Sequence, residues 1–513
     1  MEKRIYSNKI SEYAGENGGR VILLFLLFLL AIYNFITGGY SAGYNTFTLI
    51  CLSPAIVLFI YVVFRWRMAA FWMLIIINYF LQMKDIHLPV PMSLPNEMLQ
   101  ILLLGIAIID ARQAPHFERA ANLMLFSLII WCSFCTLEIL NDTCNLGFNI
   151  AAWYQGSRLM ALQLLYIFLV FSIYISTPEI LMKYLKIWAI LSLFSALWVW
   201  KQQYFGFTAA ENYWMETRGR TTHILNAGTL TRYFSTFSDA ANYGCNAAAA
   251  SVAFIIFGVT TKILREKIFF LAIGIIVFAG MFSSGTRTAI FTIAAGFVVY
   301  IFLSKSTKIA IPFSIVFALF ACLLVFTTIG QGNQQIRRMR SAFNKDDASA
   351  NVRDINKEAI KKYIKDAPWG IGIGMSDNVP ANNKYSRLAT IPPDSDYVYI
   401  WIRTGPIGIT IFVITTLIMF LGACSIVLFK LKNPSIIGIG AGLCCAFVSF
   451  QLGGYANQIL MQFPNCVIFY GGLSIVYILP YLEPAWINSE EKKLTEQKEK
   501  KRLKLEKKLA SRV

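Results

Sequence analysis

The chain has 513 residues, of which 57% are hydrophobic and only 14% are charged, and its mean hydropathy is +0.56. A soluble globular protein contains about 45–50% apolar and about 25% charged residues, so the composition excludes an ordinary soluble protein. The formal net charge of +18 is explained below by membrane topology rather than by nucleic-acid binding.

The hydrophobic residues are concentrated in blocks about 20 residues long, the length that crosses a hydrocarbon core ~30 Å thick. Such segments must be helices or strands of a closed barrel, because lipid offers no hydrogen-bond partner to free backbone groups. Barrel strands alternate apolar and polar residues, whereas runs such as 21–36 and 309–326 are apolar on every face. The sequence therefore predicts an all-α polytopic membrane protein.

The apolar blocks give about 14 candidate spans, and 12 or 13 also remain possible because the third span and the ninth and tenth are the weakest. In chain order the spans are 21–40, 46–64, 68–83, 98–112, 121–140, 158–177, 183–200, 242–261, 267–284, 286–304, 308–329, 398–429, 434–452 and 463–483. Short loops rich in Lys and Arg stay in the cytoplasm, and the basic loops of this chain all fall on one side of the alternating topology. We therefore expect a bacterial inner-membrane protein with both termini in the cytoplasm.

This topology divides the chain into four regions. Residues 1–329 hold the first 11 helices and an outer loop at 201–241, and residues 330–397 form one large periplasmic loop. Residues 398–483 hold the last three helices, and 484–513 form a basic cytoplasmic tail. The tail is either a solvated helix or a segment attracted to anionic lipid, which is worth about 1 kcal/mol per cation. Residues 488–513 lack the aromatic side chains that stack on bases, so nucleic acid is not expected as a partner.

Both outer loops are rich in charge. The first carries Arg218, Arg220, His223, Arg232 and Asp239, and the second opens with a cluster that includes Arg337 and Arg340. The second loop also contains a helical pattern that places apolar residues on one face, namely Ala359, Ile360, Tyr363 and Ile364. Simple solvation of loops that face water is an alternative explanation for the charges.

Arg287 is harder to explain by solvation. It follows a Ser-Ser-Gly-Thr break between two apolar runs, and a cation within or beside hydrocarbon costs several kcal/mol unless it is paired or hydrated. Snorkelling to the interface is the alternative. Several arginines on one outer face favour a multiply charged anion, since guanidinium groups match phosphate oxygens in bidentate geometry. Arg232, Arg287, Arg337, Arg340 and Arg353 are the candidate ligands for a pyrophosphate.

Four segments, in this order, resemble the O-antigen ligase and O-antigen polymerase family of bacterial membrane glycosyltransferases over about residues 185–425. They are Leu230–Asn242, Ser283–Arg287, Arg353–Asp366 leading into Pro368–Gly374, and Asp394–Tyr397 leading into Thr404–Gly408. None of these segments alone is specific for the family. Their order and their placement on one membrane face are much stronger evidence together. The resemblance implies a GT-C-like fold of about 12–14 transmembrane helices.

The resemblance also implies a substrate and a mechanism. An undecaprenyl-pyrophosphate-linked glycan would bind at the periplasmic face, where Arg232 and Arg287 match the two arginines that the family's ligases use near the pyrophosphate. A hydroxyl of a glycan or lipid-A-core acceptor would attack the anomeric carbon, with no metal, nucleotide sugar or other cofactor. A general base, typically worth about 10²–10⁴-fold, would help to deprotonate the acceptor.

The candidate base departs from the ligase pattern. The ligases carry a His where this chain has Asp394, followed by Ser395 and Asp396, and its three histidines (His87, His116 and His223) fall elsewhere. We expect Asp394 or Asp396 to be the catalytic carboxylate, although solvation after the Pro392-Pro393 turn is an alternative. The difference favours a polymerase or another polysaccharide-assembly enzyme over a strict lipid-A-core ligase.

A lipid-linked oligosaccharide flippase or another multi-pass transporter is the competing function. A flippase should carry charges inside several helices and have short outer loops, whereas this chain has long charged loops on one face. A secondary transporter should show two similar halves, and the segment 330–397 has no counterpart in the first half.

Overall fold

The structure is a computed structural model that describes residues 65–86, 93–109, 116–225, 230–305, 348–391 and 395–510, with isolated positions within 53–63 and 311–338. The predicted spans at 21–40, 46–64 and 308–329 lie wholly or mostly outside these residues. The chain divides into two compact units, residues 1–70 and 71–513. The second unit contains most of the described residues and, apart from the first residues of α4, all of the elements below.

Within the described part of the chain, eight helical segments are long and apolar enough to cross a membrane, and three shorter apolar helices accompany them. This confirms the predicted all-α polytopic membrane protein. The apolar helices are α4 (Arg67–Phe80), α5 (Ser93–Ile109), α6 (Leu123–Leu137), α7 (Ile150–Ser157) continued by α8 (Gln163–Tyr174), α9 (Pro178–Phe205), α12 (Ala240–Thr260), α13 (Leu264–Met281), α14 (Thr288–Leu303), α19 (Asp396–Ser425), α20 (Pro434–Ala456) and α21 (Asn465–Ala510).

Polar residues between the apolar runs set where these helices begin. The side chains of Thr177, Asp239 and Ser395 cap α9, α12 and α19 by accepting hydrogen bonds from backbone N–H groups of the first turn. Such caps satisfy donors that have no partner within the helix. The start of these three helices is therefore encoded locally, in the residue that precedes the apolar run.

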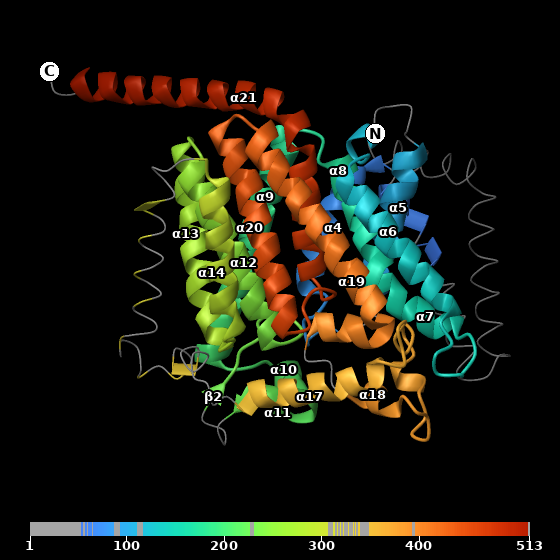
Figure 1. Cartoon of the computed structure of the whole chain (residues 1–513). Coiled ribbons are helices and arrows are strands. Elements are labelled where there is room, and N and C mark those ends of the chain that lie inside the picture. Colours follow the sequence, from blue (N-terminus) through green and yellow to red (C-terminus); the bar gives the residue numbers. More distant parts are fainter. Residues whose placement is uncertain are drawn as a thin grey trace, which may run out of the picture. The chain divides into compact units, whose positions relative to one another are not determined.

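Helix α12 lies at the centre of the bundle and packs against α13, α14 and α20 (Figure 1). Its residues Ala247–Ala250 are fully or almost fully buried. The facing surface of α20 also contains small residues. Gly442 is one of them, and an added Cβ there would collide with the Phe257 ring. Small side chains allow helix backbones to approach closely in a membrane, where van der Waals packing drives association.

The two ends of the bundle differ: one carries ion pairs between helix ends, and the other carries the outer loops. At one end, Glu266 pairs with Lys186 at 3.6 Å and with Lys493 at 3.7 Å, and Lys262 pairs with Glu490 at 3.2 Å. These basic residues were predicted to share one side of the membrane, and the last part of α21 runs across this end (Figure 1). Two prolines, Pro480 and Pro484, lie inside α21 and account for its change of direction.

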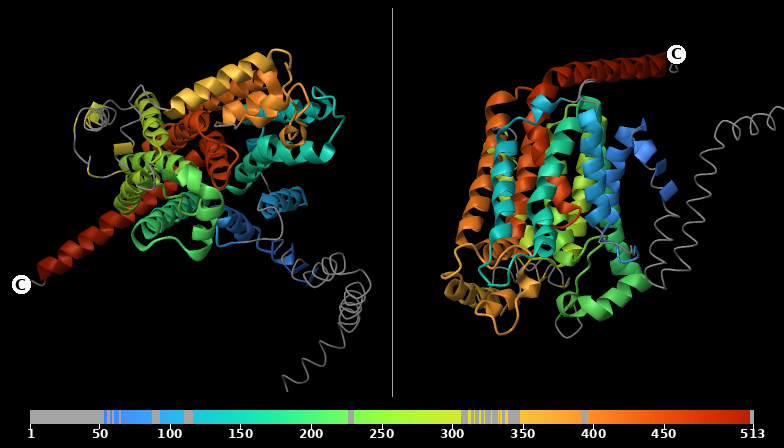
Figure 2. Two further views of the ribbon diagram at one scale, coloured as in Figure 1. Left: turned by 90° about the horizontal axis from the view of Figure 1, so that it is seen from below. Right: turned by 90° about the vertical axis from the view of Figure 1, so that its right-hand side faces the viewer.

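The other end carries the short elements of the two outer loops (Figures 1 and 2). These are α10 (Ala209–Trp214), α11 (Arg220–His223), α17 (Ala348–Ile364), α18 (Ser386–Thr390) and a two-stranded antiparallel ribbon of β1 (Ile224–Leu225) and β2 (Leu230–Thr231). Both loops thus gather where the candidate site residues were predicted.

Candidate active site

The described part of the second outer loop folds around a small core of its own. Ile360 and Ile364 of α17 are buried against Leu388 of α18 and Ile402 of α19, and Ala359 and Tyr363 pack beside them. The predicted amphipathic helix is thereby confirmed. This core fixes α17 and α18 against the first part of α19 at the outer-loop end of the bundle.

Two glycine-rich segments identified in the sequence meet in this structure. The N–H of Ile371 donates to the Ile402 carbonyl at 3.0 Å, and the N–H of Gly372 donates to the Arg403 carbonyl at 3.0 Å. Gly405 has a φ of +66°, and an added Cβ there would collide with the Pro368 carbonyl oxygen. Glycines are needed here because the two backbones are in contact and because Gly405, with its positive φ, bends α19. The bend positions residues 396–404, which carry the predicted catalytic carboxylate.

The turn between α13 and α14 gathers arginines from three parts of the chain. We call this group the arginine turn and define it as Ser283–Arg287 with Arg232 and Arg338. The Arg232 guanidinium donates to the carbonyls of Ser284 at 3.3 Å and Thr222 at 3.0 Å and to the Thr286 hydroxyl at 3.1 Å. The Arg338 Nε donates to the Gly285 carbonyl at 2.9 Å. Backbone and hydroxyl acceptors therefore orient both guanidinium groups toward the same turn.

The arginines of this turn repel one another. Desolvation is the main cause that lowers the pKa of Arg338 to about 10, and the charges of Arg232 and Arg287 lower that pKa further. Desolvation also lowers the pKa of Arg232, with a further lowering by Arg287 that Asp239 opposes. Guanidinium groups stay protonated in proteins, so the turn carries positive charge at neutral pH. A bound polyanion would relieve this repulsion, and phosphate oxygens match the geometry of guanidinium donors.

His223 holds the backbone beside the arginine turn by accepting two hydrogen bonds. Its Nε2 accepts from the Ala240 N–H at 3.1 Å, and its backbone carbonyl accepts from the Arg232 N–H at 2.8 Å. Burial is the main cause that lowers the pKa of His223 from 6.5 to about 4, and the charge of Arg232 acts in the same direction. The imidazole is therefore neutral at physiological pH and serves as a structural acceptor.

Asp396 lies at the start of α19 and is only 2% exposed. Its Oδ2 accepts from the N–H groups of Ile459 at 2.6 Å and Leu460 at 2.8 Å, in the loop between α20 and α21. The same carboxylate lines a cavity of about 280 Å³. The cavity is lined by Gln82, Ser93, Leu159, Asp396, Tyr399, Gln458, Met461, Gln462 and Phe463, and we call it the Asp396 cavity.

The walls of the Asp396 cavity are held by polar networks. Arg158 pairs with Glu97 at 3.3 Å and donates to the Ser93 hydroxyl at 2.8 Å. On the opposite wall, the Asn242 side chain of α12 donates to the Gln458 carbonyl at 3.1 Å and accepts from the Asn465 amide at 2.9 Å. Because α12 is also capped by Asp239, beside the arginine turn, one helix end connects the cations with the cavity.

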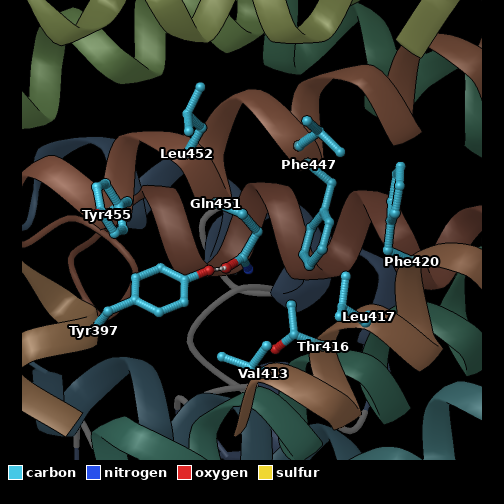
Figure 3. Close-up of a pocket in the computed structure, with 10 residues that line it drawn as sticks. Tyr397, Val413, Thr416, Leu417, Phe420, Phe447, Gln451, Leu452 and Tyr455 are labelled. Atoms are coloured by element: carbon cyan, nitrogen blue, oxygen red, sulfur yellow. Dashed lines mark hydrogen bonds between the residues drawn. The ribbon is translucent and has the colours of Figure 1, made fainter. Parts of the chain in front are cut away.

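An apolar groove of about 330 Å³ lies on the other side of the α19 N-terminus, between α19 and α20 (Figure 3). Tyr397 marks its polar end, where its hydroxyl donates to the Gln451 side chain at 3.1 Å. Phe420, Phe447 and Leu417 line the rest. Asp396 and Tyr397 are neighbours in the sequence, so consecutive residues line a polar cavity and an apolar groove.

The structure brings together only some of the predicted site residues. Arg232 and Arg287 lie close enough at the arginine turn for the charge of one to lower the pKa of the other, whereas Arg337 is exposed. Arg338, which the sequence hypothesis omitted, contacts the turn in its place. Arg340 and Asp394 lie outside the described residues, and Arg353 lies in α17 without a described side chain.

Within the described part of the chain, no group of three or more His, Cys, Asp or Glu side chains is arranged to hold a metal ion. The chemical groups that the structure does supply are guanidinium donors at the arginine turn and a carboxylate in the Asp396 cavity. Together they suit a reaction in which an anion departs and a hydroxyl loses a proton.

Residues 272–413 match the family model described as O-antigen ligase. This match confirms the resemblance seen in the sequence and supports assignment of the chain to the O-antigen ligase and polymerase family. The matched region contains Arg287, Arg338 and Asp396, while Arg232 lies before it. No curated protein matches the chain.

Proposed function

We propose, from this family assignment, that the chain is a membrane glycosyltransferase that uses an undecaprenyl-pyrophosphate-linked glycan at the periplasmic face of the bacterial inner membrane. The observation that carries the proposal is the arginine turn, where Arg232, Arg287 and Arg338 approach one another at the outer-loop end of the bundle. A lipid pyrophosphate is an anion of the right chemistry for such a group, and it reaches this end from the bilayer.

In the proposed reaction an acceptor hydroxyl oxygen forms a bond to the anomeric carbon of the donor glycan. The bond from that carbon to the pyrophosphate oxygen breaks, and its electron pair leaves with the lipid pyrophosphate. The arginine turn stabilises the charge that develops on the leaving group. The hydroxyl proton passes to a carboxylate, for which Asp396 is the described candidate and Asp394 the second.

The acceptor is a glycan or a lipid-A core, so the product is either an elongated polymer or a ligated surface polysaccharide. Asp394, followed by Ser395 and Asp396, stands where the family's ligases carry a His, which favours polymerase-type assembly. Nothing in this reaction requires a metal or a nucleotide sugar, because the glycosyl pyrophosphate is already activated.

Deletion of the gene, followed by gel analysis of surface polysaccharide and of lipid-linked intermediates, tests the proposal. Single repeat units on the acceptor would indicate a lost polymerase, and full-length polymer left on its lipid carrier would indicate a lost ligase. Complementation with Arg287→Ala should fail although the protein reaches the membrane. Unchanged surface glycans and intermediates in the deletion strain would overturn the proposal and favour a transporter.

A further inference from the structure

The Asp396 cavity differs chemically from the arginine turn. None of the nine residues that line it in the described structure is a lysine or an arginine, and its one charged residue is a carboxylate. The lining itself therefore supplies no cation for an anionic ligand. The cavity instead presents three glutamines, a serine, a tyrosine and the carboxylate, groups that donate and accept hydrogen bonds in several directions.

The amides of the cavity are available for a ligand. Gln82, Gln458 and Gln462 are half-buried, and among the residues that the structure describes none hydrogen-bonds to their side-chain amides. They come from the α4–α5 loop and the α20–α21 loop, segments more than 370 residues apart in the sequence. Each amide can donate to one hydroxyl and accept from another, which is the pattern that a polyhydroxylated ligand requires.

Apolar and aromatic surfaces complete the lining. Tyr399 contributes a ring whose centroid lies 3.4 Å from the Arg403 guanidinium carbon, a cation–π contact that holds the ring in place. Leu159, Met461 and Phe463 add apolar walls. A sugar ring has both hydroxyl groups and an apolar C–H face, so it matches this mixture better than a phosphate or an alkyl chain does.

We infer that the Asp396 cavity is the binding site for a neutral sugar ring of the acceptor glycan, with Gln458 and Gln462 as its specificity-determining residues. The inference rests on the proposed function for the identity of the ligand as an acceptor. A sugar held by these amides would present a hydroxyl to Asp396, while the donor pyrophosphate occupies the arginine turn at the other side of the α12 N-terminus. The cavity volume of about 280 Å³ is near the lower end of the range for small-ligand sites, about 300–1,000 Å³, and thus suits a short glycan end.

The first test measures transfer kinetics in membranes at varied acceptor concentration. Gln462→Ala and Gln458→Ala should each raise the acceptor KM about tenfold, the effect of removing one well-formed hydrogen bond, and should leave the donor KM unchanged. Gln155→Ala, at an exposed glutamine of α7, is the matched control. An unchanged acceptor KM in both cavity variants, or an equal rise in the donor KM, would overturn the inference.

The second test separates this inference from the proposed reaction. A soluble oligosaccharide of one surface-glycan repeat unit is titrated into purified full-length protein in detergent, and binding is followed by calorimetry. Wild type and Arg287→Ala should bind it equally, and Gln462→Ala about tenfold more weakly. Wild-type affinity in Gln462→Ala, or an affinity that falls in Arg287→Ala, would contradict the sugar site. Because no donor is present, this outcome does not depend on whether transfer occurs.

Discussion

The arginine turn and the Asp396 cavity lie at the same end of the bundle, and their chemistry is opposite. The turn presents guanidinium groups whose mutual repulsion lowers the pKa of Arg338 and Arg232. The cavity presents amides, hydroxyls and a carboxylate without a lysine or arginine among its described lining residues. The two sites are joined through the first turn of α12, which is capped by Asp239 and contacts Gln458 through Asn242. Separate sites for an anion and for a neutral ligand are what transfer from a phosphate carrier to a hydroxyl requires.

Asp396→Asn tests the cavity side of this comparison and should have the largest effect. The amide keeps an oxygen that can accept from the Ile459 and Leu460 N–H groups but is not a proton acceptor of useful basicity. If Asp396 is the general base, kcat should fall about 10²–10⁴-fold with little change in the donor KM. Measured transfer rates in purified membranes decide this, and a near-normal kcat would transfer the role to Asp394.

Arg287→Ala tests the cationic side. Removal of one preorganised donor to a developing charge costs about 10²–10³-fold in kcat, so transfer should nearly stop while the protein still folds. Arg337→Ala, at an exposed arginine of the same loop system, is the matched control and should retain activity. Equal activity of the two variants would show that the turn is not the pyrophosphate site.

Gly405→Ala tests whether the bend of α19 is needed to build the cavity. The positive φ of Gly405 and its contact with the Pro368 carbonyl leave no room for a Cβ, so the substitution should lower the free energy of unfolding by about 1–3 kcal/mol and reduce activity. Thermal unfolding of the detergent-solubilised protein measures this. Gly105→Ala has nothing within 4 Å of the added Cβ and should not destabilise the protein.

Substitution of His223 should have the smallest effect on activity. Its effect on stability should depend on pH. Because burial lowers the pKa of His223 from 6.5 to about 4, the unfolded state binds more protons than the folded state between these pH values. Stability therefore rises with pH through this window and falls as pH drops, by up to about 3 kcal/mol. Thermal unfolding of wild type and His223→Gln at several pH values between 7 and 4 should show a steeper decline for wild type. If the stability of the two proteins declines in parallel, His223 is not the cause of the loss of stability at low pH.

Much of the fold was predictable because its signals are local. Apolar runs of membrane length predict the spans, and capping residues such as Thr177 and Asp239 set where helices begin. The resemblance singled out Arg232 and Arg287 as candidate ligands, but the order of motifs did not show that the two arginines lie close together. Arg338, and not Arg337, was found to contact Gly285. The sequence could not separate these two adjacent arginines, because only the fold decides which of them faces the rest of the protein.

The Asp396 cavity could not be predicted from the sequence. Gln82, Gln458 and Gln462 lie in loops that carry no periodic pattern, and these loops are far apart in the sequence and meet only in the folded bundle. The sequence also left two carboxylates as equal candidates. The structure describes only Asp396, the first residue of α19, which is buried against Ile459 and Leu460; Asp394 lies outside the described residues.

Reconstitution tests the central claim most directly. Purified wild type or Arg287→Ala is placed in liposomes with an undecaprenyl-pyrophosphate-linked glycan and a glycan acceptor, and transferred glycan and released lipid pyrophosphate are both quantified. Wild type should release one lipid pyrophosphate for each glycan transferred, and Arg287→Ala should do so at least about 100-fold more slowly. Movement of intact donor across the bilayer without transfer, or full activity of Arg287→Ala, would contradict the account.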